Sequence, residues 1–242
     1  MLEVKNLCVS YGKNSTVKNI SFMVKAGQIA GLVGESGSGK STVVRSILGL
    51  LPANGRITSG SITLEDKNLT GLNRKEWKHI RGSKISMIFQ HPGSSMDPIV
   101  TIGDQFYECM NTVQGTGKKE AMKKAAELLS DLHMAEPERV LKSYPFELSG
   151  GMCQRAAIAI AMANNPELLL ADEPTSALDV TVQAQTIDVM MELREKYHTA
   201  ILLVTHNMGV IARMADMVGV MYHGELVEWG TRAEILEAPA HP

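Results

Sequence analysis

The chain has 242 residues, of which 44% are hydrophobic and 21% charged, so it has the length and composition of a globular protein with a full hydrophobic core. Its formal net charge of −2 gives no electrostatic reason to expect a nucleic-acid partner. The three cysteines, Cys8, Cys109 and Cys153, form no C-x-x-C pair, which argues against a disulfide scaffold or a zinc site.

The predicted elements alternate between strand-like and helix-like patterns, which is typical of an α/β fold. In chain order, residues 2–24 and 60–64 predict short antiparallel strands. Residues 28–33 predict a buried strand, and residues 41–50 predict the helix after it. Further parallel core strands are predicted at 85–89, 168–171 and 201–204, and a C-terminal hairpin at 217–222 and 225–229.

The segment between residues 89 and 168 has a helical pattern instead. Residues 118–132 carry apolar side chains at a spacing of three to four, and residues 152–163 predict a long apolar helix. We therefore expect a single domain over residues 1–242. In it, about 1–90 and 165–242 form the α/β core with a β subdomain, and 91–164 form an inserted helical lobe.

A glycine-rich loop follows the strand predicted at 28–33, with the pattern G-x-x-x-x-G-K-[ST]. In such a loop backbone N–H groups surround a polyphosphate, while Lys40 reaches the β and γ oxygens and Ser41 offers a hydroxyl to Mg²⁺. A purely structural glycine loop is the alternative, but strand, loop and helix occur in the order that a phosphate site requires. The expected nucleotide-binding residues here are Gly34, Glu35, Ser36, Gly37, Ser38, Gly39, Lys40, Ser41 and Thr42.

Polar side chains follow three of the predicted core strands, at Gln90, at Asp172 with Glu173, and at His206. Ligand crevices in open α/β sheets lie at the carboxyl ends of strands, so these residues are expected at one edge. Asp172 would hold Mg²⁺, and Glu173, facing the other way on an extended backbone, would accept a proton from the attacking water. His206 would contact the γ-phosphate and orient that glutamate or water. The alternatives are a core strand that ends at solvent and a structural histidine.

Leu148, Ser149, Gly150 and Gly151 precede the apolar helix predicted at 152–163. A capped helix with a flexible approach is the simpler interpretation, because Ser149 lies near an N-cap position. Two consecutive glycines would also let a large ligand approach the backbone, and a helix start favours an anion. Since the Lys40 loop already serves one ATP, we expect this second segment to complete the site of a neighbouring molecule.

Together these features resemble the ATP-binding subunit of ABC transporters over essentially the whole chain. The resemblance rests on Tyr11, the loop at 34–41, Gln90, residues 148–151, Asp172, Glu173, Ser176, Ala177, Leu178, Asp179 and His206. It implies a P-loop (RecA-like) core sheet with an N-terminal antiparallel β subdomain and an inserted helical subdomain. It also implies a head-to-tail pair of ATPase domains with two ATP molecules between them. Tyr11 would stack on adenine, Gln90 would sense Mg²⁺ and contact the membrane subunit, and Asp179 would communicate across the interface.

Finer detail is similar to the peptide/nickel importer subfamily at residues 87–98, 101–105 and 144–155. Residues 138–147 are especially similar to nickel-import ATP-binding subunits of the D type. Met152, His91 and Asn207 depart from the family pattern, which usually has glutamine, an acid and aspartate there. Because Met152 also occurs in this subfamily, we expect reduced polar contact at that position and no loss of function.

The resemblance implies an ATP-hydrolysing subunit of a bacterial importer of nickel or a related metal chelate, at the cytoplasmic face of the membrane. The alternative is a dipeptide or oligopeptide importer. The implied partners are a second, related ATPase subunit, two integral-membrane permeases and an extracytoplasmic solute-binding protein, with no nucleic acid. A soluble ATPase of DNA repair or translation is the alternative from a different class. The segment between Lys40 and Ser149 is too short for the long coiled coil of the repair type.

Overall fold

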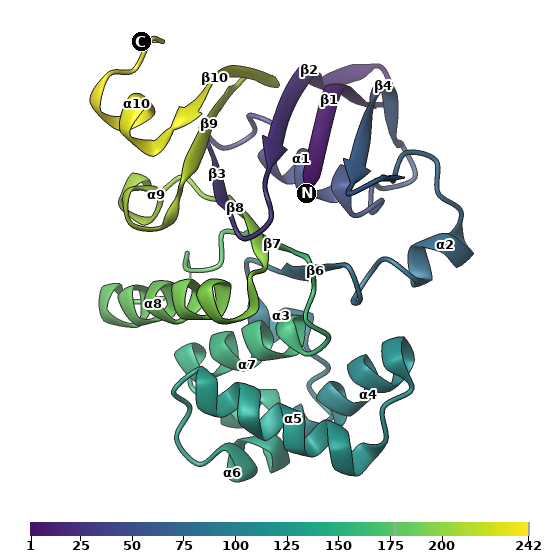
Figure 1. Ribbon diagram of the computed structural model, residues 1–242, viewed down its shortest axis with the longest axis vertical. Coiled ribbons are helices and arrows are strands. Elements are labelled where there is room, and N and C mark those ends of the chain that lie inside the picture. Colours follow the sequence, from purple (N-terminus) through teal and green to yellow (C-terminus); the bar gives the residue numbers. More distant parts are fainter. Residues whose placement is uncertain (177, 242) are drawn as a thin grey trace. The chain divides into compact units, whose positions relative to one another are not determined.

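The computed structural model describes residues 1–176 and 178–241, with Ser94 described by its backbone only. The chain divides into two compact units, Met1–Trp77 with Ala200–Pro242 and Lys78–Thr199. Figure 1 labels most of the helices and strands of both. Each unit contains both strands and helices.

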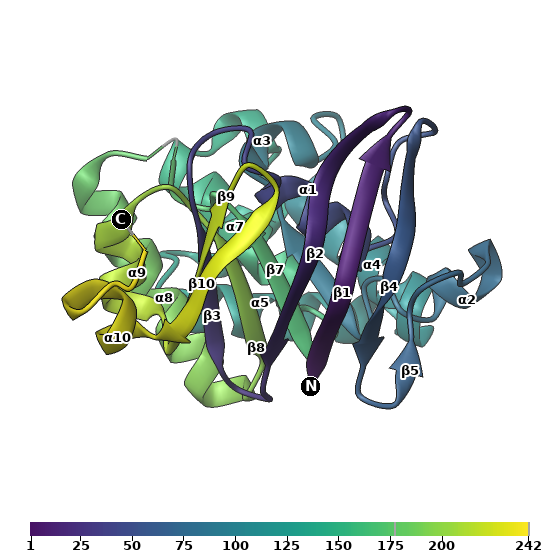
Figure 2. The same ribbon diagram turned by 90° about the horizontal axis from the view of Figure 1, so that it is seen from above.

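The first unit contains an antiparallel sheet with the strand order β2-β1-β4-β5, whose first three strands lie side by side in Figure 2. Its strands are β1 (Leu2–Tyr11), β2 (Asn14–Val24), β4 (Gly55–Leu64) and β5 (Lys67–Asn68). The strands β1 and β2 run for 10 and 11 residues, so they are longer than predicted. In β2, buried and exposed side chains alternate towards its end, which is the pattern of a sheet with one face on a core.

The same unit contains the strand that leads into the glycine-rich loop. This strand, β3 (Ile29–Val33), lies in the order β10-β9-β3-β8. The other strands are β8 (Ala200–Val204), β9 (Met217–Tyr222) and β10 (Glu225–Thr231). Both β3 and β8 are buried along their whole length, as expected of parallel strands covered on two faces. They pair in parallel up to Leu32 and Val204, so the phosphate loop and His206 leave the sheet at the same edge. The antiparallel pairing of β9 with β10 confirms the predicted hairpin.

The helices of the first unit are short. They are α1 (Lys40–Ile47), α2 (Arg74–Lys78), α9 (Met208–Met214) and α10 (Arg232–Glu237). The α1 helix ends three residues before the predicted position because Gly49 has a φ of +61° and its Cα lies against Trp77. A Cβ at Gly49 would stand 2.4 Å from that indole ring. Asn207 caps α9 by accepting a bond from the Gly209 N–H at 2.9 Å, so the departure from aspartate keeps the capping function.

The second unit contains two short parallel strands, β6 (Ile85–Ile88) and β7 (Leu168–Asp172). They pair along their length, and the last pair is Ile88 with Ala171. Because the strands are parallel, the residues after both lie at one edge. Phe89, predicted to end the first strand, lies outside it and is 45% exposed.

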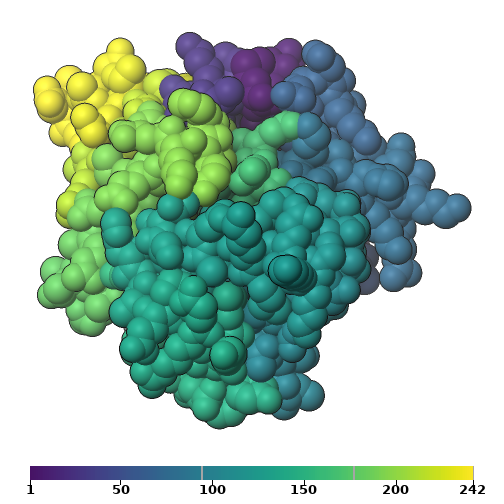
Figure 3. Space-filling model, turned by 60° about the horizontal axis from the view of Figure 1, so that its bottom comes forward, coloured from purple at the N-terminus to yellow at the C-terminus, as the bar shows by residue number. Residues whose placement is uncertain are grey.

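The rest of this unit is helical, and Figure 3 faces its teal part. The helices are α3 (Pro92–Ser95), α4 (Ile102–Gln114), α5 (Lys118–Asp131), α6 (Pro137–Lys142), α7 (Gly150–Met162) and α8 (Val180–Tyr197), with a 3₁₀ turn at Pro145–Glu147. The predicted helices at 118–132 and 152–163 are therefore present. The division of the domain at residues 90 and 165 stays a prediction. Across residues 1–176 and 178–241, no helix is both long and apolar enough to span a membrane.

Candidate functional site

The glycine-rich loop is closed around the ammonium group of Lys40. Its Nζ donates to the carbonyl oxygens of Gly34 at 2.8 Å and Glu35 at 2.7 Å, and to Ser38 Oγ at 3.3 Å. Lys40 is only 6% exposed. The cation is thus already desolvated and held in the loop, where a phosphate oxygen would gain a charge-assisted hydrogen bond.

The start of α1 supplies the other phosphate-binding features. Its N-cap is Gly39, which has a φ of +105° and no side chain that could satisfy the first N–H groups of the helix. These donors and the positive end of the helix dipole suit an anion. Ser41 is half-buried in the first turn, where its hydroxyl suits a hard cation such as Mg²⁺. The loop therefore fits the predicted nucleotide.

Two glycines of the loop differ in what surrounds them, which gives a testable contrast. A Cβ on Gly34 would stand 2.1 Å from the carbonyl oxygen of Met221, whereas a Cβ on Gly37 meets no described atom within 4 Å. Both residues have positive φ, +147° and +83°. We expect Gly34→Ala to lower the free energy of unfolding of the nucleotide-free subunit by about 3 kcal/mol or more, because backbone strain and a backbone clash add.

The matched variant Gly37→Ala carries only the backbone strain, about 1–2 kcal/mol. Urea denaturation of both variants beside the wild type would measure the difference. Equal destabilisation by the two substitutions would contradict the contact between Gly34 and Met221.

Tyr11, the predicted adenine platform, lies at the end of β1. Its hydroxyl donates to Thr42 Oγ1 at 3.3 Å, which connects it to the helix after the phosphate loop. A Cβ on Gly55 would stand 2.7 Å from the tyrosine ring, so the backbone of Gly55 supports the ring. Stacking on adenine stays a prediction.

His206 lies beside the start of the phosphate loop. It shares a cavity of about 420 Å³ with Gly34 and Glu35, which Pro239 and His241 also line. The His206 side chain is exposed. This position supports the predicted contact with a terminal phosphate, which stays a prediction.

In the second unit, the side chains of Gln90 and Glu173 meet. Gln90 Nε2 donates to Glu173 Oε2 at 3.0 Å, although the two residues are far apart in the sequence. Asp172 ends β7 and is half-buried. The parallel pairing of β6 with β7 thus brings together the polar residues that follow both strands.

The backbone at Glu173 is not extended, so that expectation was wrong. Its φ is +49°, in the left-handed region. The chain turns directly after the strand, where the Ser176 N–H and hydroxyl both bond to the Glu173 carbonyl oxygen at 3.2 Å. A non-glycine residue in this region is strained, and such strain is frequent at functional sites.

The donors at this edge suit Mg²⁺. Asp172 offers a carboxylate. Gln90 donates to Glu173 through its amide nitrogen, so its amide oxygen is not used in that bond. Carboxylate and amide oxygens are both ligands that Mg²⁺ accepts. Both residues therefore have the kind of donor that the predicted metal role requires.

The segment at 148–151 starts α7, and its serine is the N-cap. Ser149 Oγ accepts from the Met152 N–H at 3.3 Å, and Ser149 and Gly150 are exposed. The two glycines differ: a Cβ on Gly150 meets no described atom within 4 Å, whereas one on Gly151 would stand 2.6 Å from Val182 Cγ1. Packing within this chain therefore explains Gly151, and Gly150 with Ser149 presents the backbone that a ligand could approach.

Asp179 has a structural role that the sequence reasoning missed. It is the N-cap of α8, and its Oδ1 accepts from the N–H groups of Thr181 at 3.1 Å and Val182 at 3.0 Å. An aspartate just before a long helical segment is a known start signal, which could have indicated this role. Ala177, part of the predicted family motif, lies outside the described residues.

The described residues also contain a larger cavity, of about 1250 Å³, among α4, α5, α6 and α8. Its described lining, which includes Met122, Leu141, Lys142 and Asp131, contains none of the predicted site residues. The predicted site residues instead lie in one group around Lys40 and another around Glu173. That these two groups form one site stays a prediction.

Comparison with known proteins shows the family to which the chain belongs. A protein-family model described as ABC transporter matches residues 17–176. The chain is 46% identical over 247 residues to "Dipeptide transport ATP-binding protein DppD" of Lactococcus lactis subsp. cremoris (strain MG1363), covering 100% of this chain and 71% of that protein. It is also 46% identical to "Oligopeptide transport ATP-binding protein AppD" of Bacillus subtilis (strain 168), covering 100% and 75%.

A solved structure agrees with the predicted fold class. The ATP-binding cassette MJ0796, in a dimeric post-hydrolysis state bound to ADP and Pi, matches with a TM-score of 0.83 and 29% sequence identity over 96% of this chain and 99% of that one. The mixed α/β fold with an antiparallel β subdomain and a helical region is thereby confirmed. With its phosphate loop, its acidic strand end and these matches, the chain belongs to the ABC transporter family as an ATP-binding, ATP-hydrolysing subunit.

Proposed function

We propose that the chain hydrolyses ATP to power the import of dipeptides or oligopeptides through a separate membrane channel. The observation that carries this proposal is the 46% identity, over the whole chain, to relatives named for dipeptide and oligopeptide transport. The nickel interpretation rested on residues 138–147, and the names of these relatives give it no support. Nickel or a metal chelate is therefore the competing outcome of the test.

The geometry supports the following proposed roles. The loop and α1 hold the phosphates of ATP, and Ser41, Gln90 and Asp172 would hold Mg²⁺, which when bound neutralises charge on phosphate oxygens. Glu173 accepts the proton of the attacking water, with its carboxylate oriented by Gln90 at 3.0 Å. His206, which belongs to the group around Lys40, contacts the γ-phosphate and orients Glu173 or the water.

The proposed neighbour is a second ATPase subunit, on whose ATP residues 148–151 act. The exposure of Ser149, Gly150 and Asp179 supports this role. Val180 follows Asp179 and is 81% exposed, so an apolar side chain lies next to these residues where a partner would contact them. An isolated monomer should therefore hydrolyse little ATP.

The proposed membrane partners are two permeases, which would place the chain at the cytoplasmic face of the membrane. Exposed apolar side chains on the second unit support a contact of this kind. Ile99 is 81% exposed and Phe146 is 72% exposed, and Phe146 stacks on Tyr144 with ring centroids 5.5 Å apart. The Ile102 N–H donates to the Ser143 carbonyl at 2.9 Å, which holds the two segments together. The exposed side chains thus lie on two hydrogen-bonded segments, one after Gln90 and one before residues 148–151.

Transport by the assembled complex tests the proposed function. The chain would be purified with the permeases that accompany it, reconstituted into vesicles with the solute-binding protein, and supplied with ATP. We expect ATP-dependent uptake of a labelled dipeptide or oligopeptide. Uptake of ⁶³Ni²⁺ without peptide uptake would favour the nickel alternative, and co-purification with ribosomes or DNA in place of permeases would contradict an importer.

A further inference from the structure

The first turns of α7 and α8 are packed against each other. Gly151 lies so close to Val182 that a Cβ would stand 2.6 Å from its Cγ1. The N-cap of α7 is Ser149 and that of α8 is Asp179. Both N-cap residues have predicted roles at the subunit interface. The helices that they begin therefore touch each other within one unit.

Arg155 connects the same two helices one turn further along. Its Nη2 donates to Gln185 Oε1 on α8 at 2.8 Å. Its Nη1 lies 3.4 Å from the carbonyl oxygen of Leu132 and 3.3 Å from that of His133, at the carboxyl end of α5. A guanidinium suits this place, because carbonyl groups at a helix end have no partners within the helix and carry partial negative charge.

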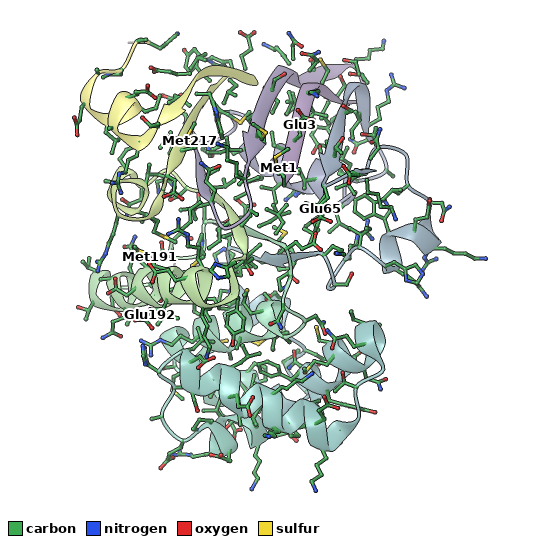
Figure 4. All side chains as sticks on the ribbon, in the orientation of Figure 1. Met1, Glu3, Glu65, Met191, Glu192 and Met217 are labelled. Atoms are coloured by element: carbon green, nitrogen blue, oxygen red, sulfur yellow. The ribbon has the colours of Figure 1, made fainter. Side chains whose placement is uncertain are left out.

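The end of α5 is also tied to α8 directly. His133 Nε2 and Glu192 Oε2 are 2.9 Å apart, and Figure 4 labels Glu192 on α8. Arg155 thus lies where α5, α7 and α8 meet, and it makes hydrogen bonds to the other two helices. The planar fork of arginine has donors on two separate nitrogens that reach both helices at once, whereas the donors of a lysine all lie on one nitrogen.

We propose that Arg155, with Gln185, is a positioning residue that holds residues 148–151 in fixed relation to Asp179. The two segments then meet the neighbouring subunit as one body. This role rests on the proposed function, because it matters only if residues 148–151 act on the ATP of a partner. Since Arg155 lies on neither the phosphate loop nor the Glu173 edge, its loss should affect turnover and leave ATP binding to the chain's own loop intact.

Steady-state hydrolysis by the assembled transporter tests this role with four variants. We expect Arg155→Ala to lower kcat roughly 10- to 100-fold, since small displacements of a positioned group have effects of this size. Gln185→Ala should also lower kcat, and the double variant should be no slower than Arg155→Ala, because Gln185 acts through its contact with Arg155. Arg155→Lys should recover part of the rate. ATP affinity of the isolated subunit should stay within about twofold, as the interaction removed is made away from the bound nucleotide.

The matched control is Arg139→Ala, which removes an arginine of the same unit whose side chain is 81% exposed and pairs with Glu136. It should leave kcat unchanged. Normal kcat for Arg155→Ala in a transporter whose wild type is active would overturn the positioning role alone, and so would a loss of ATP affinity equal to the loss of kcat. Absence of hydrolysis by the wild-type complex would overturn the proposed function and this role with it.

Discussion

Replacing Glu173 by glutamine is expected to leave ATP bound and to slow its hydrolysis about 10²- to 10⁴-fold, the usual effect of losing a general base. The carboxylate is the proposed proton acceptor for the attacking water, and a neutral amide cannot take that proton. The size and shape of the side chain hardly change. The rate of phosphate release by the assembled transporter measures the effect, and calorimetry with ATP measures binding.

The structure makes Glu173→Gln an informative substitution. Glu173 Oε2 accepts a hydrogen bond from Gln90 Nε2 at 3.0 Å, and the side-chain oxygen of glutamine can accept the same bond. The turn after β7 depends on the Glu173 carbonyl, which the substitution does not touch. A large loss of rate would therefore report the missing proton acceptor.

Glu127→Gln is the matched control, since Glu127 is on α5 with its side chain 62% exposed. It should hydrolyse ATP at the wild-type rate. Near-normal turnover of Glu173→Gln would remove Glu173 from the role of general base, and loss of ATP binding would show that the residue acts in binding instead.

The core strands and the phosphate loop could be predicted because their signals are local. Parallel strands buried on both faces need unbroken apolar runs, which is how β3, β7 and β8 stand out in the sequence. The loop combines glycines, which permit positive φ, with a lysine at a fixed distance from the strand. Ser149 as a helix cap also follows from local sequence.

Contacts between distant residues could not be predicted in this way. The Gln90 to Glu173 bond depends on the pairing of β6 with β7, and the left-handed backbone of Glu173 depends on the turn that follows. Gly151 looks like a flexible approach to a helix, yet its absent side chain is needed for the approach of Val182. In each case the physical cause is a partner far along the chain or a turn geometry that residue types alone do not specify.

The transported substrate could not be predicted for a different reason. The sequence carries a strong signal for the residues predicted around ATP, since phosphate and Mg²⁺ require particular donors and acceptors at fixed spacing. Cargo selection is proposed to lie in other subunits, so this chain is under no direct physical requirement to match a peptide or a metal. The short similarity at residues 138–147 therefore favoured nickel, whereas whole-chain similarity favours peptides.

Replacing Lys40 by alanine is expected to weaken ATP binding about 10- to 100-fold, because a hydrogen bond to a charged group contributes about 1.5–3 kcal/mol. Lys40 Nζ also holds the loop closed through the carbonyl oxygens of Gly34 and Glu35, so its removal leaves the loop less ordered before ATP arrives. Calorimetry with the isolated subunit measures the effect.

Lys25→Ala is the matched control, because Lys25 is an exposed lysine of the same unit, and it should bind ATP as the wild type does. The choice of nucleotide separates the two causes. A lost contact to the β and γ oxygens weakens ATP far more than AMP, whereas a disordered loop and helix start weaken both. Because the ammonium group is buried in the loop and already desolvated, we expect the larger effect on ATP. Unchanged ATP affinity of Lys40→Ala would exclude the loop at 34–41 as the phosphate site, and with it the assignment of the acidic edge at Asp172 and Glu173 to the same nucleotide.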